Sequence, residues 1–431
     1  MNEYDSKRIY DLTKKINYFP TDNFKEANCY ILNTCHIREK ATDKVYHDIG
    51  RVKKEFRNKQ KPIVLIAGCV AQAEGDVLLK REKYIDAVVG PQSYHQINET
   101  ISKLEKKIKP INITDFNVIE KFDTLNSFKN TDNNISSFLT IQEGCDKFCK
   151  FCVVPYTRGT EYSRSINELV LEANQLVSNG AREINLLGQN VNAYNFEDKK
   201  LSDLILELSR IKDLKRIRYT TSHPRDFTED LIMVHEKCKK LMPLIHLPVQ
   251  SGSNKILKAM NRRHTIEDYY EITKKLIKVN PKIKFSSDFI IGYPGETHDD
   301  FNRTLELMIN IGYINSFSFI FSPRPGTPAF NLDKIDEKVA KNRLTDFQHT
   351  AEKIKNKYRK NLIKKNVKVL FENKMKNSNK YFGRDEYFNS VIVESNNDLT
   401  GKIMNVKILK TNQNTLFGEI TLNFDKSNYA A

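Results

Sequence analysis

The sequence lacks the features of a membrane or exported protein. It contains no run of about 18 apolar residues, the length that a membrane-spanning helix needs. Residues 1–20 carry charges of both signs and no apolar stretch, so they do not form a signal peptide. No internal repeat of solenoid period is evident. From these absences we expect a cytoplasmic protein without a membrane partner.

Cysteine is scarce, with seven in 431 residues. Disulfide frameworks belong to oxidising compartments, and usually to short chains with an even number of cysteines. An odd number in a long chain without an export signal argues against such a framework. The thiols are therefore available for other chemistry.

The composition supports folded domains and an anionic partner. Hydrophobic residues make up 39% and aromatic residues 10%, enough for real cores, and the length suggests two or three domains. The net charge of +16 favours a polyanion, because Lys and Arg neutralise phosphates. A chain rich in Lys, Asn and Ile is also what AT-rich coding DNA produces, so the charge supports nucleic-acid binding without establishing it.

The pattern of apolar runs divides the chain into three domains of the α/β and β classes. Residues 1–107 alternate strands and helices and form a small α/β domain, and residues 108–137 form a polar, turn-rich linker. The alternation resumes in residues 138–366, and residues 367–431 hold the short alternating segments of a small β-barrel or sandwich. In the first domain we predict strands at 29–33, 63–67 and 86–90 and helices at 39–56 and 95–107.

The central domain has six apolar strand candidates, mostly followed by helical stretches. Six β/α units are too few for a closed eight-stranded barrel but fit an open, partial (β/α)6 barrel, in which loops at the C-terminal strand ends carry the site. A long charged helix follows at about 335–365. The strand candidates are 138–142, 183–188, 215–220, 244–249, 283–291 and 316–321.

Three cysteines follow the first of these strands with the spacing Cys-x3-Cys-x2-Cys: Cys145, Cys149 and Cys152. They supply three thiolates where a [4Fe–4S] cube has four irons, so one iron is left free to bind a small molecule and pass it an electron. A structural zinc site needs four ligands, and no fourth partner lies nearby in the sequence. We therefore predict an iron–sulfur cluster in this loop.

The segments on both sides of the three cysteines, residues 138–144 and 153–161, resemble those of the radical S-adenosylmethionine superfamily, and within it the methylthiotransferases. The resemblance implies that the open iron binds the amino and carboxylate groups of S-adenosylmethionine. One electron then cleaves the sulfonium and releases a 5′-deoxyadenosyl radical. It also implies that Phe151 lies beside the adenine.

Polar segments at two further strand ends are candidates for binding S-adenosylmethionine. Gly188 lets the backbone approach a ligand, although a glycine after a strand is more often just a turn. The resemblance gives Gly188, Gln189 and Asn190 to the methionine amino group. It gives Gln250 and Ser251 to the nucleoside, whereas from the residues alone this pair could simply cap the helix that begins near residue 254.

The fifth and third strands end in two more candidates. By resemblance Ile290 and Gly292 pack on the adenine, and the alternative is plain core strand. His223 closes the third strand, and we interpret it as a satisfied structural histidine.

Together these segments closely resemble the tRNA isopentenyladenosine methylthiotransferases of the MiaB type, over residues 1 to about 425. The resemblance implies a transferase that methylthiolates carbon 2 of N6-isopentenyl-adenosine beside the tRNA anticodon. S-adenosylmethionine then serves as methyl donor and radical source, with an unidentified electron donor and sulfur donor. We expect a monomer. The motifs that carry the resemblance are Asn33-Thr34-Cys35, Ile37-Arg38-Glu39-Lys40-Ala41, Gly188-Gln189-Asn190-Val191-Asn192, His246-Leu247-Pro248-Val249-Gln250 and Met260-Asn261-Arg262-Arg263.

Alternatives to this function stay open. The same chemistry could act on another modified adenosine or on a ribosomal protein. A catalytically silent iron–sulfur protein that binds RNA belongs to a different class, and a zinc-dependent RNA-binding module is a third possibility.

Cys35 and Cys69 each follow a buried strand, and adjacent parallel strands would bring the two thiols together. The resemblance implies that they bind an auxiliary [4Fe–4S] cluster with a third cysteine, which precedes the segment at which this sequence begins. Our hypothesis is that Met1 is an internal methionine and that the first strand is missing. We expect weakened auxiliary-cluster binding and an exposed strand edge. Cys29 and Cys238 are expected to be structural, as buried free cysteines usually are.

The last section resembles the TRAM domain, a small β-barrel that grips tRNA in these enzymes. Lys and Arg on a barrel face with exposed aromatic residues suit phosphate contact and base stacking. On composition alone an ordinary β accessory domain fits equally well. We expect Arg384 to be the main RNA contact.

Overall fold

The computed structural model describes residues 1–35, 40–108, 110–127 and 130–421, and for residues 40 and 41 it describes the backbone alone. The predicted motif residues 37–39 and the end of the predicted C-terminal domain, residues 422–431, lie outside this part. No helix in the described ranges is long and apolar enough to cross a membrane.

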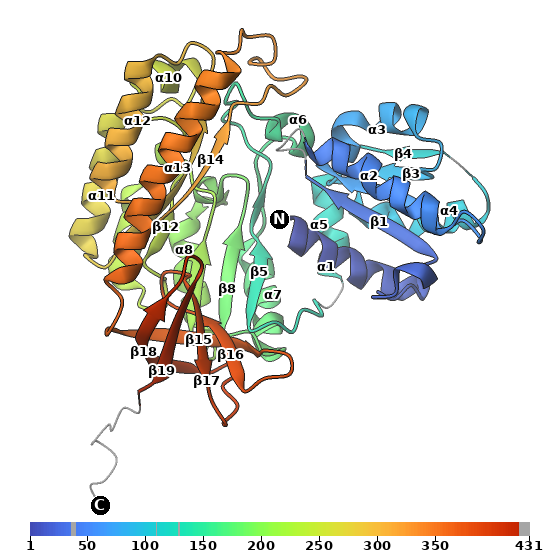
Figure 1. Cartoon of the computed structure of the whole chain (residues 1–431). Helices are drawn as coiled ribbons and strands as arrows, with labels where there is room; N and C mark the ends of the chain where they lie inside the picture. The colour runs from blue at the N-terminus through green and yellow to red at the C-terminus, as the bar shows by residue number, and fades with distance from the viewer. Residues whose placement is uncertain (36–39, 109, 128–129, 422–431) are drawn as a thin grey trace, which may run out of the picture.

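The N-terminal domain is a parallel sheet with helices on both faces (Figure 1). Alternate strand residues enter opposite layers, because side chains of a strand alternate between its faces. Leu65 and Ala67 pack with α1 and α4, whereas Ile66 packs with α2 and α3. The sheet order is β1 (Cys29–Thr34), β2 (Ile63–Gly68), β3 (Ala87–Val89) and β4 (Ile111–Ile113), and the helices are α1 (Asn2–Thr13), α2 (Lys40–Glu55), α3 (Cys69–Arg81) and α4 (Ile97–Glu105).

The strand positions predicted for this domain are confirmed, and so is the strand edge. β1 pairs with β2 on one side, and no strand in the described part of the chain pairs with its other side. The helix predicted at 95–107 is present as α4, preceded by one 3₁₀ turn at Tyr94–Gln96.

The prediction of a linker at 108–137 is wrong for most of that segment. β4 adds the fourth strand to the N-terminal sheet, so this domain extends beyond residue 107. α5 (Val118–Asn126) follows, and its Phe122 and Leu125 pack against Leu12 of α1. A three-residue strand and a nine-residue helix carry too little periodicity to stand out beside the polar residues around them.

The central domain is the open barrel that the six apolar runs predict. Its strands run parallel in two three-stranded sheets, β5-β8-β11 and β12-β13-β14, which are joined by a single bridge between Ile217 and Leu241. No pairing joins β5 to β14 among the described residues, so the barrel stays open. The strands are β5 (Ser136–Thr140), β8 (Glu183–Leu187), β11 (Arg216–Tyr219), β12 (Leu244–His246), β13 (Lys284–Ile291) and β14 (Asn315–Ile320).

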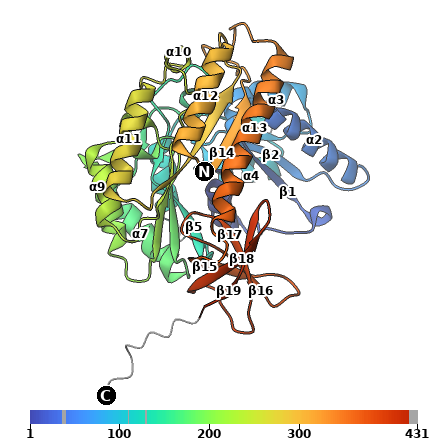
Figure 2. The same cartoon turned by 60° about the vertical axis from the view of Figure 1, so that its left-hand side comes forward.

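Helices cover the outside of this barrel, and one apolar core lies between them and the strands. The turned view shows α13 crossing the molecule down to the C-terminal barrel (Figure 2). The helices are α6 (Val154–Arg158), α7 (Ile166–Ser178), α8 (Leu201–Ser209), α9 (Glu229–Lys237), α10 (Asn254–Ala259), α11 (Ile266–Val279), α12 (His298–Ile311) and α13 (Glu337–Lys360). Two short antiparallel pairs lie in the loops: β6 (Gln142–Glu143) with β7 (Tyr162–Ser163), and β9 (Asn195–Phe196) with β10 (Lys199–Lys200).

The C-terminal section is a closed five-stranded barrel, which confirms the predicted small β-barrel. Two arginines of β11 attach it to the central domain. Arg216 donates to the backbone carbonyls of Arg384 and Lys368, each at 2.9 Å, and Arg218 donates to that of Asp385 at 2.8 Å. The strands are β15 (Asn366–Lys374), β16 (Lys380–Arg384), β17 (Ser390–Glu394), β18 (Ile403–Thr411) and β19 (Thr415–Ile420).

Candidate active site

The loop that carries the three predicted cluster ligands begins right after β6, at the C-terminal end of the first barrel strand. Gly144 opens it with a φ of 76°, and a Cβ there would lie 1.8 Å from the carbonyl oxygen of Thr160. Only glycine fits this position. The Cys145 N–H donates to the carbonyl of Gly159 at 3.1 Å, and the Gly144 N–H donates to Oε1 of Gln189 at 2.7 Å. The base of the loop is thereby fixed.

The tip of the loop is held by two later segments of the chain. Lys150 donates its N–H to the carbonyl of Met260 and accepts from the N–H of Ala329, both at 3.0 Å. Asn261 Nδ2 donates to the carbonyl of Phe148 at 2.9 Å. The loop is therefore preformed by contacts that the sequence spacing alone does not reveal.

The three thiols of this loop are near enough for their charges to act on one another, and none of the seven cysteines forms a disulfide. Burial, together with the charges of the neighbouring thiols, raises the pKa of Cys145 and Cys152 to about 12. Arg262 Nη1 donates to Sγ of Cys149 at 3.6 Å. No three His, Cys, Asp or Glu side chains of the described chain converge as the ligands of a single ion do, whereas the thiolates of a cube each bind a different iron. Three thiols beside a buried cation fit an anionic cluster.

Five buried polar atoms without a hydrogen-bond partner in the described structure occur at the C-terminal strand ends and in the segment after α10. Buried polar groups nearly always have a partner, so such a group is what a polar ligand would satisfy. The atoms are Asn190 Oδ1, Ser222 Oγ, His223 Nε2, Arg262 Nε and His264 Nε2. These atoms fit the polar end of S-adenosylmethionine or of a nucleoside.

Two of these residues, His223 and His264, form an edge-to-face pair with ring centroids 5.6 Å apart. Burial, with the charge of Arg262, lowers the pKa of His223 well below its usual value and that of His264 to about 4, so both rings are neutral near pH 7. His223 Nδ1 accepts from the N–H of Arg225, which leaves a proton on its Nε2. The interpretation of His223 as a satisfied structural histidine holds for its Nδ1, whereas its Nε2–H has no acceptor in the described structure.

The residues that the resemblance gives to the adenine come together in the structure. Phe151 and Ile290 pack on the same group of apolar side chains. This group lies between the loop of the three cysteines and the end of β13. Its buried members are Ile256, Met260, Tyr293, Phe321 and Ala329. Gly292 turns the chain just beyond it with a φ of 72° and donates its N–H to Oε1 of Glu296 at 3.1 Å.

Gly188 serves a close contact with protein rather than an open turn. A Cβ at Gly188 would lie 2.7 Å from Oε1 of Gln142, and this oxygen accepts the N–H groups of Gln189 and Asn190. Residues 188–190 thus hold the base of the cysteine loop through Gln142 and Gly144. Their contact with the methionine amino group stays a prediction.

The Gln250–Ser251 turn is tied into the sheet and the following helix. Gln250 has a φ of 77° and is bridged to Phe289 of β13. Ser251 Oγ accepts from the N–H of Ser253, which in turn caps α10 through the N–H of Ile256. Helix capping thus accounts for Ser251 and Ser253, and the nucleoside contact of Gln250 and Ser251 stays a prediction.

Cys35 and Cys69, the auxiliary pair of predicted cluster ligands, follow the ends of two adjacent parallel strands, as predicted. Thr34 and Gly68 are partners in the parallel register of β1 and β2, so Cys35 and Cys69, the residues directly after them, leave the sheet from adjacent positions, Cys69 as the first residue of α3. The charge of Cys69 also contributes to the raised pKa of Cys152. The auxiliary pair therefore lies near the cluster loop. Cys29 and Cys238 pack in apolar clusters, as expected of structural cysteines.

A buried ion group beside Cys69 was not foreseen from the sequence. Arg158 Nη2 lies 2.8 Å from Asp5, and Lys121 Nζ lies 2.6 Å from Glu143. Burial acts to lower the pKa of Arg158, yet the charges of Asp5, Cys69 and Glu143 raise it well above the usual value. The group joins α1, α5, β6 and α6, so it fixes the N-terminal domain against the cluster loop.

The Arg384 side chain is partly enclosed by Glu372 and Phe388, whereas a main RNA contact would be expected to be exposed. Its Nε lies 2.9 Å from Glu372, and its guanidinium stacks 4.2 Å from the ring centroid of Phe388. Contact of Arg384 with RNA stays a prediction. No role was predicted for Arg262, which contacts Cys149. Its place in the Met260–Arg263 motif was the one signal in the sequence that pointed to it.

Comparison of the sequence with known proteins shows the family to which the chain belongs. Residues 139–308 match the radical SAM superfamily, and residues 1–90 match an uncharacterized protein family, UPF0004. The tRNA-2-methylthio-N(6)-dimethylallyladenosine synthase of Pelagibacter ubique is 58% identical over 98% of this chain and 95% of its own. The synthase of the same name from Rickettsia akari is 49% identical over 97% of both chains.

Among solved structures, the radical S-adenosylmethionine methyltransferase TsrM of Kitasatospora setae, bound to tryptophan and an S-adenosylmethionine analogue, has a TM-score of 0.59. It is 13% identical and the match covers 76% of this chain and 72% of that one, so this likeness concerns the fold alone. The relatives at 49–58% identity extend over nearly the whole chain, including the cluster loop and both flanking domains. The chain therefore belongs to the family of tRNA-2-methylthio-N(6)-dimethylallyladenosine synthases, within the radical SAM superfamily.

Proposed function

We propose that this chain is a transferase that places a methylthio group on carbon 2 of N6-isopentenyl-adenosine (N6-dimethylallyl-adenosine) next to the anticodon of tRNA. S-adenosylmethionine serves as methyl donor and as radical source. The observation that carries the proposal is the preformed loop with three clustered thiols, set in a radical SAM barrel whose relatives are named for this reaction.

The residues of the cluster loop supply the means for this chemistry. When bound, a [4Fe–4S] cluster with an open iron provides the electron that cleaves the sulfonium of S-adenosylmethionine. Cys145, Cys149 and Cys152 hold it, and Arg262 places positive charge beside Cys149. Phe151 and Ile290 offer an apolar surface to the adenine.

A second [4Fe–4S] cluster is assigned to Cys35 and Cys69, which follow paired strand residues. Cys35 and Cys69 each supply one thiolate to it. Iron analysis after anaerobic reconstitution tests this: Cys35→Ala should lower the iron content per chain, and an unchanged content would refute the assignment.

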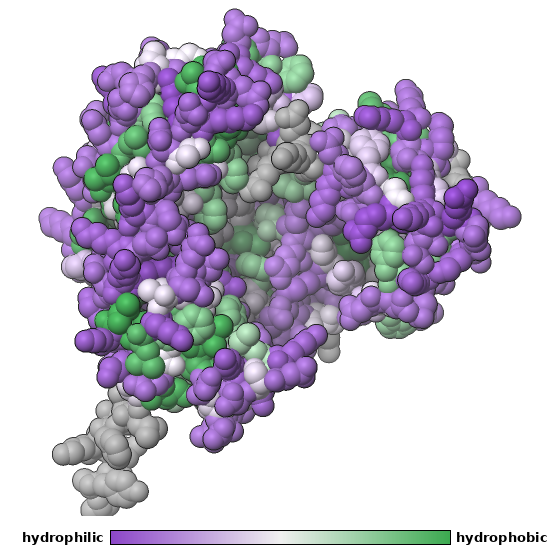
Figure 3. Space-filling model, in the orientation of Figure 1, coloured by the Kyte–Doolittle hydropathy of each residue, from purple (hydrophilic) through white to green (hydrophobic). Residues whose placement is uncertain are grey.

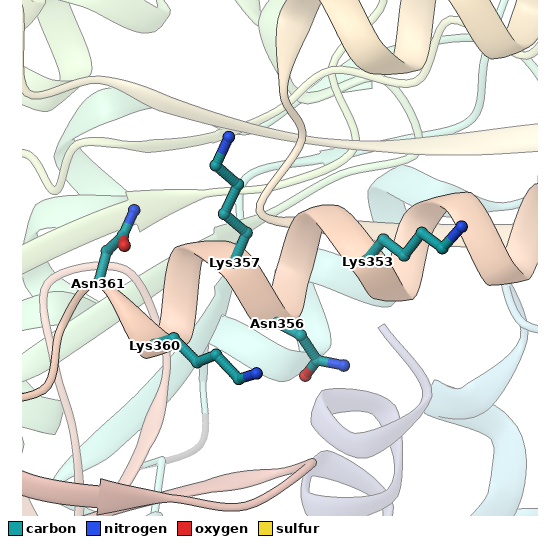
Figure 4. A pocket seen from close by; sticks show the side chains of 5 residues that line it. All are labelled: Lys353, Asn356, Lys357, Lys360 and Asn361. Atoms are coloured by element: carbon teal, nitrogen blue, oxygen red, sulfur yellow. The ribbon is translucent and has the colours of Figure 1, made fainter.

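The tRNA has a basic surface available at the junction of α13 and the C-terminal barrel. A hollow of about 490 Å³ is lined by Lys353, Asn356, Lys357, Lys360 and Asn361 (Figure 4). The three lysines recur at helical spacing, are exposed, and make no ion pair within the described part of the chain. Lysines at a helix C-terminus also stabilise the helix dipole, which accounts for Lys357 and Lys360 but not for Lys353, two turns from the end.

Arg359, next to Lys360 on α13, ties this end of the helix to the C-terminal barrel. Its guanidinium donates to the backbone carbonyls of Asn412, Gln413 and Asn414, so the turn between β18 and β19 is fixed against α13. A preformed basic groove binds phosphates without first paying the entropy of ordering. We expect phosphates of the tRNA to contact this basic surface.

We further propose that the protein acts as a monomer in the cytoplasm and receives its electron and its sulfur from separate donors. Analytical ultracentrifugation of the reconstituted chain, with and without tRNA, tests the oligomeric state. A dimer in the absence of tRNA would contradict it.

Two measurements test the proposed reaction. The reconstituted chain should form 5′-deoxyadenosine from S-adenosylmethionine under strong reductant, and Cys149→Ala should abolish this while Cys238→Ala, a buried cysteine of the barrel core, leaves it. Nucleoside mass spectrometry of tRNA from cells with and without the gene should show the methylthio derivative only when the gene is present. An intact cluster that yields no 5′-deoxyadenosine would favour the silent RNA-binding protein instead.

A further inference from the structure

The sixth barrel strand, β14, reverses the usual burial of side chains. Its aromatic residues Phe317 and Phe319 are 46% and 39% exposed, while Ser316 and Ser318 occupy the opposite face. A strand that served packing alone would turn the phenylalanines toward the core and the serines toward water. Both rings therefore keep a large part of their apolar surface accessible to solvent, which is unusual for phenylalanine.

The register shows which face carries the two rings. Phe317 pairs with Asp288 and Phe319 pairs with Ile290, so these residues share a face of the sheet. Ile290 belongs to the face that meets Phe151 beside the cluster loop. The opposite face packs on α13, where the ring of Phe289 lies 4.7 Å from that of Phe347 by centroids. Phe317 and Phe319 therefore face the lumen of the open barrel.

Polar groups border the two rings on the same face. His246 lies edge-to-face with Phe317 at 6.1 Å between centroids, and its Nε2 lies 3.4 Å from Asp288. Its Nδ1 is 2.9 Å from the hydroxyl of Ser286. The space-filling view shows exposed hydrophobic surface in the hollow between the α13 side of the barrel and the N-terminal domain (Figure 3). An apolar platform with a polar border suits an aromatic base that carries an apolar substituent.

We propose that Phe317 and Phe319 form a platform on which the isopentenyl-bearing adenine of the tRNA packs for reaction. Unpaired RNA bases are held by stacking on aromatic side chains, and the isopentenyl group adds apolar surface that the rings can cover. The register places Phe319 beside Ile290, the residue assigned to the adenine of S-adenosylmethionine, so a base on the platform lies next to the radical source. This inference rests on the proposed function.

The test compares binding of two RNAs that differ only in the substituent. Phe317→Ala and Phe319→Ala are measured against tRNA that carries N6-isopentenyl-adenosine and against the same tRNA with plain adenosine. Affinity for the modified tRNA should fall about tenfold, and the fall should be smaller for the unmodified one, which loses the stacking of the base but has no isopentenyl contact to lose. Phe317→Tyr, which keeps the ring, should restore most of the affinity. Phe19→Ala, which removes a 68% exposed ring on the N-terminal domain, is the matched control and should bind both RNAs as the parent does.

Two outcomes would overturn the platform: an equal loss of affinity for both RNAs, or no loss for either. Thermal unfolding of each variant shows whether it is folded, and because both rings are exposed we expect little change. The binding comparison needs no turnover. It can therefore fail while methylthiolation persists, or hold while methylthiolation is absent, so the two proposals are judged separately.

Discussion

At the scale of single residues, the cluster loop depends on positions where only one side chain fits. Gly144 combines a positive φ with contact against the backbone of the returning segment, and Gly188 leaves room for the Gln142 side chain. Neither requirement is visible in the sequence, because it arises from a segment that is distant along the chain. The cysteines could be predicted from spacing, whereas Arg262 could not, since its contact with Cys149 depends on how residues 260–264 fold back.

Replacement of Gly144 by Ala should destabilise the loop by more than the usual cost of a positive φ. A Cβ would meet the carbonyl of Thr160 at 1.8 Å, so the loop must shift. Gly326→Ala is the matched control, because its φ is 80° but its Cβ would meet no described atom within 4 Å. We expect about 1 kcal/mol for Gly326→Ala and clearly more for Gly144→Ala, with less iron bound. Chemical unfolding and iron analysis measure both, and equal costs would contradict the clash.

At the scale of elements, continuous apolar runs allowed the barrel strands to be predicted, because a parallel strand buried on both faces needs such a run. The predicted strand ends differ from the observed ones by a few residues where the apolar run continues into the loop. The strand predicted at 244–249, for example, is β12, which ends at His246. β4 and α5 were missed because their stability comes from packing on the first domain rather than from a local pattern.

The attachment of α5 can be tested through its buried lysine. Lys121→Met should cost about 3–5 kcal/mol of unfolding free energy, since it leaves the buried carboxylates of Glu143 and Asp5 with one cation fewer. The matched change Lys341→Met removes an exposed ion pair with Glu337 on α13 and should cost far less. Urea unfolding measures both variants. Similar costs would show that the buried group contributes no more than a surface pair.

At the scale of the whole molecule, three buried histidines should make stability fall as the pH drops below about 6.5. Burial lowers the pKa of His235 to about 3 and that of His264 to about 4, and it lowers the pKa of His223 as well. The unfolded chain takes up protons near pH 6.5 while the folded chain does not, so protonation favours unfolding. Each histidine should contribute about 1 kcal/mol of destabilisation between pH 7 and 5.5.

Unfolding of the metal-free chain at these two pH values tests this dependence. His235→Gln cannot titrate but can still bond with the Tyr219 hydroxyl, which lies 2.6 Å from His235 Nε2. It should remove about a third of the pH effect. The same change at the exposed His47 serves as control and should leave the effect in place. If His235→Gln behaves like the control, the buried histidines do not govern the acid sensitivity.

In the part of the chain that the structure describes, the six strands of the central domain end at two edge strands, β5 and β14, that do not pair with each other. A complete cylinder admits only what can enter through its mouth, which suits a metabolite but not one nucleotide still attached to a folded nucleic acid. A cylinder left unsealed along its length can receive such a nucleotide sideways while the bulky remainder stays outside. The open wall thus leaves room for a nucleotide that remains part of a folded nucleic acid, and inserting further β/α units to seal it should abolish turnover on the macromolecule before it affects cleavage of the small cosubstrate.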